Sequence, residues 1–127
     1  MTGRLRVGVM GCSSFARRAM LPALLRSGCA ELVAVASRDP AKAAQAAAEF
    51  GCAGIAGYGE LLRRDDIEAV YMPLPTGLHA EWCPRALEAG KHLLVEKSFA
   101  ATTASAREMT ALARARNRLV AENFQFQ

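Results

Sequence analysis

Short apolar segments alternate with Ala- and Leu-rich segments of helical period, and this alternation most restricts how the chain can fold. Runs such as LVAVA and HLLV are typical of parallel strands that are buried on both faces. The predicted strands are residues 4–10, 31–37, 67–75, 91–97 and 118–124, and the predicted helices are residues 15–27, 39–50, 77–90 and 102–117. Strand–helix–strand units at this spacing indicate an α/β protein with a doubly wound parallel sheet. With 127 residues, the chain has the length of a single domain.

Residues at the ends of the predicted helices support these assignments. The segment DPAKAAQAAAEF has Asp39 as its N-cap, Pro40 at its first position and Gly51 just beyond its end, a distribution that helix termini favour. Pro22 is an exception, because it lies inside the predicted first helix and cannot donate a hydrogen bond to the carbonyl of Arg18. We therefore expect a kink in that helix at Pro22.

Composition and charge exclude several classes of protein. Hydrophobic residues make up 52% of the chain and charged residues 22%, as in a globular domain. No apolar run approaches the ~20 residues of a membrane span, and the start MTGRLRVGVMG lacks the pattern of a signal peptide, so we expect a cytoplasmic protein. The net charge of +4 comes without the basic, aromatic-rich motif typical of nucleic-acid binding. The four cysteines and two histidines lack metal-ligand spacing, so no metal is expected.

The turn after the first predicted strand resembles a dinucleotide-binding turn of the Rossmann type, although only one of its three glycines is present. Gly11 can form the tight turn, and Ala16 can allow the helix to pack closely on the strand. Ser13 replaces the glycine that approaches the pyrophosphate, but its hydroxyl can donate to a phosphate oxygen. The predicted phosphate-binding segment is Gly11, Cys12, Ser13, Ser14, Phe15 and Ala16. The turn alone leaves open a connection that binds nothing.

The end of the second predicted strand indicates which dinucleotide would bind. NAD-binding domains carry an acidic residue there, which bonds the adenosine ribose. In this chain Ser37 and Arg38 stand in that place, and a hydroxyl and a guanidinium would bind a 2′-phosphate. Asp39 is one position further on, where it serves as the helix cap. The sequence therefore predicts NADP(H), with NAD(H) as the less favoured cofactor.

Three later motifs resemble the N-terminal domain of the glucose–fructose oxidoreductase, inositol dehydrogenase and MocA family (Gfo/Idh/MocA). They are YMPLPTGLHAEW (71–82), GKHLLVEKSFA (90–100) and AENF (121–124), and with the opening turn they extend over almost the whole chain. Within the family, the turn and the PLPTGLHAEW segment are most similar to nucleotide-sugar 3-ketoreductases of deoxysugar biosynthesis. One departure is Ser98, which stands where the family usually has proline.

The resemblance implies roles for particular residues. Lys97 and Glu96 would be catalytic, with Lys97 assisting the substrate oxygen and both lying beside the nicotinamide. Further cofactor contacts would come from Pro73, Leu74, Pro75, Thr76, His79 and Asn123. The implied reaction is the NADPH-dependent reduction of a keto group on a nucleotide-linked deoxyhexose. Two alternatives stay open: a truncated or partner-dependent nucleotide-binding module without catalysis of its own, and an inositol or polyol dehydrogenase that uses NAD(P).

The resemblance also divides the chain. Residues 1–123 would form the NADP(H)-binding Rossmann domain, and residues 124–127 would begin the crossover to a second, substrate-binding and oligomerisation domain that we expect to be absent from this chain. Phe124 and Phe126 would then be exposed. We therefore expect self-association, or a partner chain, at the exposed C-terminal edge.

Overall fold

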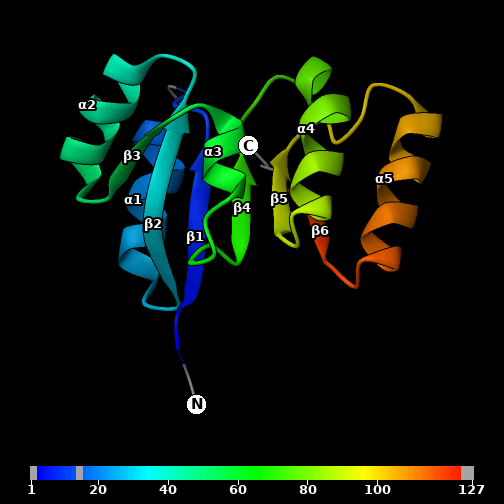
Figure 1. Ribbon diagram of the computed structural model, residues 1–127, viewed down its shortest axis with the longest axis horizontal. Coiled ribbons are helices and arrows are strands. Elements are labelled where there is room, and N and C mark those ends of the chain that lie inside the picture. Colours follow the sequence, from blue (N-terminus) through cyan, green and yellow to red (C-terminus); the bar gives the residue numbers. More distant parts are fainter. Residues whose placement is uncertain (1–2, 14–15, 124–127) are drawn as a thin grey trace.

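The computed structural model describes residues 3–13 and 16–123, and its centre is one parallel sheet (Figure 1). The sheet has six strands in the order β3-β2-β1-β4-β5-β6. The strands are β1 (Leu5–Met10), β2 (Ala30–Ser37), β3 (Ala53–Ala56), β4 (Ala69–Met72), β5 (His92–Glu96) and β6 (Val120–Asn123). All five pairings are parallel. The doubly wound parallel α/β fold predicted from the sequence is therefore confirmed.

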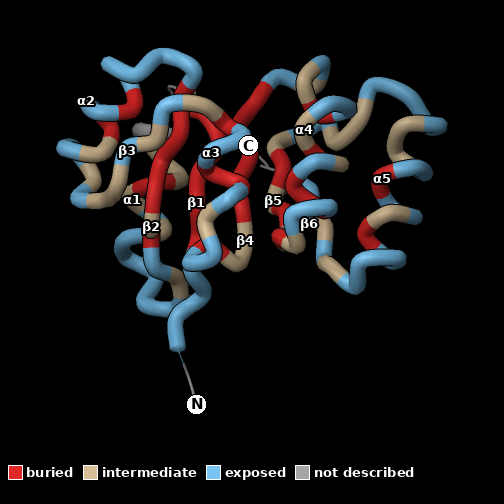
Figure 2. Tube along the Cα trace, in the orientation of Figure 1, coloured by how far each residue is buried: buried red, intermediate tan, exposed pale blue. Residues whose placement is uncertain are grey.

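Helices cover both faces of the sheet because side chains of each strand point alternately to the two faces. The helical elements are η1 (Ala16–Met20), α1 (Leu21–Ser27), α2 (Pro40–Phe50), α3 (Tyr58–Leu62), α4 (Thr76–Glu88) and α5 (Thr103–Ala115). Leu21 of α1 and Ala46 of α2 belong to one buried cluster, whereas Tyr58, Leu87 and Met109 of α3, α4 and α5 belong to the other. Figure 2 shows the buried residues concentrated along the central strands.

The structure corrects two details of the predicted elements. The sequence pattern indicates no helix or strand between the predicted elements 39–50 and 67–75, whereas the structure has β3 and α3 there. The predicted kink inside the first helix is instead a change of helix type. A π-helical turn, η1, ends at Met20 and the α-helix begins at Leu21, so Pro22 lies in the first turn, where a missing N–H costs little.

The predicted helix ends are confirmed where they matter for the site. The Asp39 carboxylate accepts a hydrogen bond of 2.9 Å from the N–H of Ala41 at the start of α2. The helix ends at Gly51, which has a positive φ of 69° and donates to the carbonyl of Ala47. These two caps fix α2 between the second and third strands.

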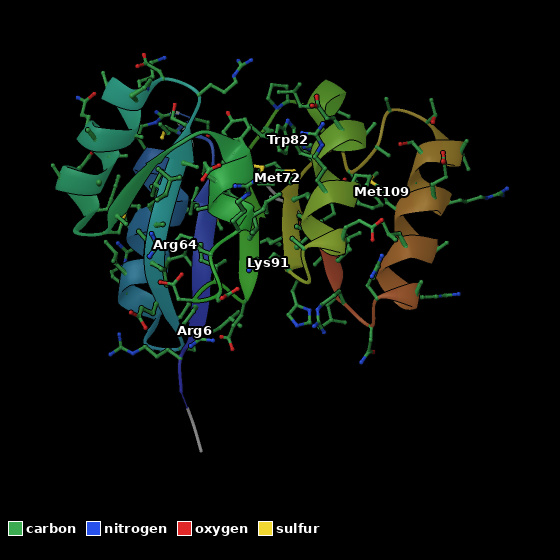
Figure 3. All side chains as sticks on the ribbon, in the orientation of Figure 1. Arg6, Arg64, Met72, Trp82, Lys91 and Met109 are labelled. Atoms are coloured by element: carbon green, nitrogen blue, oxygen red, sulfur yellow. The ribbon has the colours of Figure 1, made fainter. Side chains whose placement is uncertain are left out.

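A buried lysine ties the α3–β4 connection to the strand that follows α4. The Lys91 ammonium donates to the carbonyls of Arg64, at 2.6 Å, and Ile67, at 2.8 Å. Figure 3 shows Lys91 and Arg64 below Met72, which ends β4 at the opposite edge of the sheet. Burial lowers the pKa of Lys91, while the nearby carboxylates of Asp65 and Asp66 act in the other direction. No described helix is long and apolar enough to cross a lipid bilayer.

Candidate functional site

The predicted site segments meet at the carboxyl edge of the sheet. The strand order reverses between β1 and β4, since β2 and β3 lie on one side of β1 and β5 and β6 lie on the far side of β4. Residues 11–13, 37–38, 73–76 and 96–97 directly follow β1, β2, β4 and β5 or end them. Ligands of open parallel sheets bind outside the carboxyl ends of strands at such a reversal. The fold therefore brings these four segments, which the sequence predicts to form the site, to the carboxyl edge of the sheet.

The turn after β1 is held tightly between its neighbours. Gly11 has a φ of +116°, and its N–H donates to the carbonyl of Ala36 at 2.9 Å. A Cβ at Gly11 would lie 3.1 Å from a methyl group of Leu74, so a side chain there would crowd the segment after β4. Cys12 and Ser13 continue the turn and are half-buried. The turn thus keeps the tight backbone that only glycine adopts readily.

The rest of the predicted phosphate-binding segment is described only in part. Ser14 and Phe15 lie outside the described residues, and Ala16 is the first residue of η1. Their predicted contacts with a cofactor remain predictions.

The end of β2 presents a hydroxyl and a guanidinium, while its nearest carboxylate is engaged elsewhere. Ser37 is buried, and its Oγ accepts a hydrogen bond of 3.1 Å from the N–H of Asp39. The Asp39 carboxylate caps α2 through Ala41. Arg38 is exposed beyond the strand end. A carboxylate that already accepts from a helix N–H is a weaker candidate for the ribose than the two residues before it.

The segment after β4 leads directly into α4. Pro73 and Leu74 are buried and Pro75 is exposed. Thr76, the first residue of α4, is half-buried, and its Oγ1 accepts a hydrogen bond of 3.2 Å from the N–H of Ser98. The predicted groove segment 73–76 therefore contacts the segment that follows β5.

His79 joins the same two segments from inside the protein. The imidazole is fully buried. Its Nε2 lies 2.8 Å from the carbonyl oxygen of Leu74, and its Nδ1 lies 2.9 Å from that of Phe99. A neutral ring can donate to one of the two carbonyls, and a protonated ring can donate to both. With no exposed surface, the ring holds the two segments together, a role that the geometry favours over the predicted cofactor contact.

Glu96 ends β5 and is bonded by a residue that the sequence did not single out. The hydroxyl of Tyr71, a buried residue of β4, donates a short hydrogen bond to Oε2 of Glu96. Burial raises the pKa of Tyr71 well above its usual range, and the Glu96 carboxylate raises it further. The phenol therefore stays protonated and keeps donating across the physiological pH range. Lys97 follows Glu96, is exposed, and precedes a cis peptide bond to Ser98.

The last described strand contributes the carboxylate of Glu122, which the sequence did not indicate as a site residue. Glu122 Oε2 accepts a hydrogen bond of 2.7 Å from the N–H of Phe99. Asn123, the predicted cofactor contact, pairs in register with Glu96, which brings its backbone to the carboxyl edge as expected. Its side chain is not described. Over residues 3–13 and 16–123, no group of three or more His, Cys, Asp or Glu residues could hold a metal ion.

A sheet of this order, with a glycine turn after β1 and loop segments at the carboxyl ends of β2, β4 and β5, defines a nucleotide-binding domain of the Rossmann type. The chain belongs to the Gfo/Idh/MocA oxidoreductase family, which has an NAD-binding Rossmann fold and whose family model matches residues 5–124. The family resemblance read from the motifs is therefore confirmed.

Several relatives are 3-reductases of a dTDP-linked dideoxyglucose. The chain is 53% identical over 122 residues to dTDP-3,4-didehydro-2,6-dideoxy-alpha-D-glucose 3-reductase of Saccharopolyspora spinosa, covering 96% of this chain and 37% of that protein. It is 52% identical to the same reductase of Streptomyces violaceoruber, covering 96% and 36%. KijD10, a 3-ketoreductase from Actinomadura kijaniata solved with TDP-benzene and NADP, superposes with a TM-score of 0.94 at 47% identity, covering 96% and 39%. The chain thus spans a little over a third of these relatives' length.

Proposed function

We propose that this chain is the NADP(H)-binding part of an oxidoreductase that reduces a keto group of a nucleotide-linked deoxyhexose. The observation that carries the proposal is the pair Ser37 and Arg38 at the end of β2, where a hydroxyl and an exposed guanidinium stand in place of the acidic residue of NAD-binding domains. The names of the relatives support the substrate class, and the NADP bound to KijD10 supports the cofactor.

The described residues fit a dinucleotide. Gly11 keeps the tight turn that the first glycine of a dinucleotide-binding turn provides, because a Cβ there would lie 3.1 Å from a methyl group of Leu74. The Arg38 side chain is exposed and can pair with a 2′-phosphate through two parallel hydrogen bonds. When bound, NADPH would supply the hydride for the reduction. We propose that His79 acts indirectly, by holding the segments of Leu74 and Phe99 together. The proposed cofactor contacts are Gly11, Cys12, Ser13, Ser14, Phe15, Ala16, Ser37, Arg38, Pro73, Leu74, Pro75, Thr76, Glu96, Lys97 and Asn123.

Lys97 is the group that we propose to act on the substrate oxygen. Reduction of a ketone develops negative charge on that oxygen, and an ammonium group can stabilise the charge and donate a proton. Lys97 is exposed at the carboxyl edge, and Glu96 beside it is held by the Tyr71 hydroxyl. The ammonium would transfer its proton to the oxygen and recover one from solvent. We assign residues 1–123 to the cofactor domain and residues 124–127 to the crossover toward a substrate domain.

The cofactor preference is tested with Arg38→Asp. Titration with NADPH and NADH, followed by nicotinamide fluorescence, should show that the unchanged chain binds NADPH more tightly. The substitution should weaken NADPH binding about tenfold to 100-fold, because a paired cation is replaced by an anion that repels phosphate. Arg107→Asp, the same change at an exposed position of α5, is the control and should leave both affinities within about twofold. Equal affinities of the unchanged chain for NADPH and NADH would overturn the proposal.

The reaction is tested with a TDP-linked 3-keto-deoxyhexose, with and without a separately supplied substrate domain of a relative. NADPH consumption should depend on Lys97, and Lys97→Met should lower kcat by about 100-fold or more. If NADPH binds but no keto sugar is reduced in either case, the binding module without catalysis is the better description. Oxidation of inositol with NAD in the same assay would instead favour the polyol dehydrogenase.

We also propose a cytoplasmic location and self-association at the C-terminal edge. Two observations support association: β6 pairs only with β5, so one side of it is an unpaired edge among the described strands, and Leu119 just before it is 75% exposed. Phe124 and Phe126, which the sequence predicts to be exposed, lie outside the described residues. Sedimentation at increasing protein concentration tests the proposal, and a single monomeric species at all concentrations would refute it.

A further inference from the structure

The peptide groups that follow Lys97 are bonded by three side chains from other elements. The N–H of Ser98 donates to Thr76 Oγ1, and the N–H of Phe99 donates to Glu122 Oε2 at 2.7 Å. The carbonyl of Phe99 faces Nδ1 of the buried His79 at 2.9 Å. Three polar groups of the backbone of residues 98 and 99, which follow the exposed lysine, are therefore bonded from α4 and from β6.

These bonds begin where pairing within the sheet ends. The β4–β5 register ends at Val95, and the β5–β6 register ends at Glu96. Lys97 is thus the first residue beyond β5, at the point where the described pairing within the sheet ends. The direction in which its side chain leaves the sheet depends on what holds residues 98 and 99.

Glu122 differs from the other two partners because its acceptor is a carboxylate. Hydrogen bonds between an ionised carboxylate and a backbone N–H are shorter and stronger than those between neutral groups. Glu122 also comes from β6, whereas Thr76 and His79 come from α4. It therefore links the segment after β5 to the strand on the other side, and Phe99 is held at both its N–H and its carbonyl.

We propose that Glu122 is a positioning residue for Lys97. Its carboxylate bonds this segment from β6, while His79 and Thr76 bond it from α4. Together they fix the peptide groups of Ser98 and Phe99, and so the backbone from which the Lys97 side chain extends. The proposal rests on the proposed function for its effect on turnover, because it assumes that Lys97 acts on the substrate oxygen. The effect on the backbone itself needs no substrate and no cofactor.

The first test measures amide hydrogen exchange by NMR in the unchanged chain and in Glu122→Ala, Glu122→Gln and Thr76→Val. Loss of the acceptor in Glu122→Ala should speed exchange of the Phe99 amide about tenfold or more, relative to amides within β5. Glu122→Gln retains an acceptor oxygen and should restore most of the protection. Thr76→Val should expose the Ser98 amide selectively. Unchanged exchange at Phe99 in Glu122→Ala would overturn the proposal.

The second test measures turnover of the keto sugar by the same variants, with whatever substrate domain the unchanged chain needs. A displaced lysine should lower kcat about tenfold or more in Glu122→Ala while the KM for NADPH stays within about twofold. Glu122→Gln should keep most of the kcat. Faster exchange with an unchanged kcat would overturn the positioning role. A kcat loss that Glu122→Gln does not rescue would also count against it.

Two controls separate this proposal from a general loss of structure and from failure of the proposed function. Glu88→Ala removes a carboxylate that pairs with Arg116 at the far end of α4, and it should change neither Phe99 exchange nor kcat. If Glu122→Ala does not fold, Glu122→Gln and Thr76→Val still report on the two amides. If the unchanged chain reduces no keto sugar, the proposed function fails, and amide exchange alone then decides whether Glu122 fixes the backbone at Lys97.

Discussion

Tyr71 and Glu96 connect the interior of the sheet to its carboxyl edge. The phenol is buried on β4, and its hydroxyl reaches the carboxylate at the end of the neighbouring strand. The parallel register places Tyr71 opposite Leu94, so Glu96 is the next residue along β5 on the same face. A carboxylate held from below in this way cannot turn freely beside Lys97. The hydrogen bond between Tyr71 and Glu96 therefore orients the Glu96 side chain at the end of β5.

Tyr71→Phe removes the hydroxyl and little else, and it tests this link. At neutral pH we expect the free energy of unfolding to fall by about 1–2 kcal/mol, because Glu96 loses its donor. The folded chain holds the phenol proton more tightly than the unfolded chain, in which the pKa is near its usual value of 10.0. The contribution is therefore complete below pH 10 and is lost as the pH rises above it.

Urea unfolding followed by circular dichroism from pH 7 to pH 11 measures both effects. The difference in stability between the unchanged chain and Tyr71→Phe should be constant up to about pH 10 and should shrink above it. Ionisation of other groups cancels in this difference. Equal stability of the two proteins at pH 7 would show that the Tyr71–Glu96 bond does not contribute in solution.

At the scale of elements, the sequence predicts those strands and helices whose apolar residues follow a recognisable pattern. Five strands and the longer helices were found because each has a run of apolar residues or a helical pattern with caps. The other two elements, β3 and α3, are short, and the glycines at positions 51, 54, 57 and 59 interrupt their apolar residues, so neither period can be recognised. These elements form because β3 pairs with β2 and because Tyr58 and Leu61 of α3 are buried in the core. Tertiary contacts, and not local preference, stabilise them.

The same reasoning explains which site residues were found. Gly11 and Arg38 follow predicted strands directly, so the alternation indicates their place at the carboxyl edge, whereas Lys97 was singled out by the family resemblance. The partners of the site are different, because Tyr71 and Glu122 meet residues 25 and 23 positions away in sequence. Such contacts depend on the strand order and on register, which a single sequence does not report.

Gly54 shows how closely α2 and β3 pack, and it gives a prediction for this pair of elements. An ideal Cβ at Gly54 would lie 2.7 Å from the carbonyl oxygen of Ala43, a backbone atom that cannot move without shifting α2. We expect Gly54→Ala to lower the free energy of unfolding by about 1–3 kcal/mol. Gly59→Ala on α3, where nothing lies within 4 Å of the new methyl group, should instead stabilise the protein by up to about 1 kcal/mol.

Chemical denaturation of the two glycine variants, run side by side, checks this prediction. Both substitutions add one methyl group and restrict the unfolded chain equally, so this effect cancels in their difference. The difference then reports the contacts of the new methyl group with Ala43 and Ala47 together with the helix preference at Gly59. If the two variants were equally stable, α2 and β3 would be free to separate at no cost.

At the scale of the whole molecule, the two ends of the parallel strands differ in their residues and in their proposed roles. The carboxyl edge carries the exposed Arg38 and Lys97 and the turn at Gly11. Toward the other edge, Lys91 is buried and bonded to the carbonyls of Arg64 and Ile67, which anchors the α3–β4 connection (Figure 3). Changes there should therefore affect the stability of the molecule without affecting what it binds.

Lys91→Met separates these two properties. The apolar side chain fills a similar volume but leaves the two carbonyls without their donor, so we expect a loss of about 2 kcal/mol at neutral pH. Burial lowers the pKa of Lys91 below its usual 10.5, so the folded chain binds this proton less tightly than the unfolded chain. The stability of the unchanged chain should then gain as the pH rises toward 10.5, and Lys91→Met should lack this gain.

Urea unfolding and NADPH titration of the same samples measure the separation. The affinity for NADPH should change less than about twofold in Lys91→Met, because its effect is confined to the edge away from the proposed cofactor site. Lys42→Met on the exposed face of α2 removes the same charge without burial and should leave both quantities nearly unchanged. If Lys91→Met weakened NADPH binding as much as it lowered stability, the two edges would be coupled through β4 and β5. Retained stability would instead mean that the ammonium contributes no more than an apolar side chain of its size.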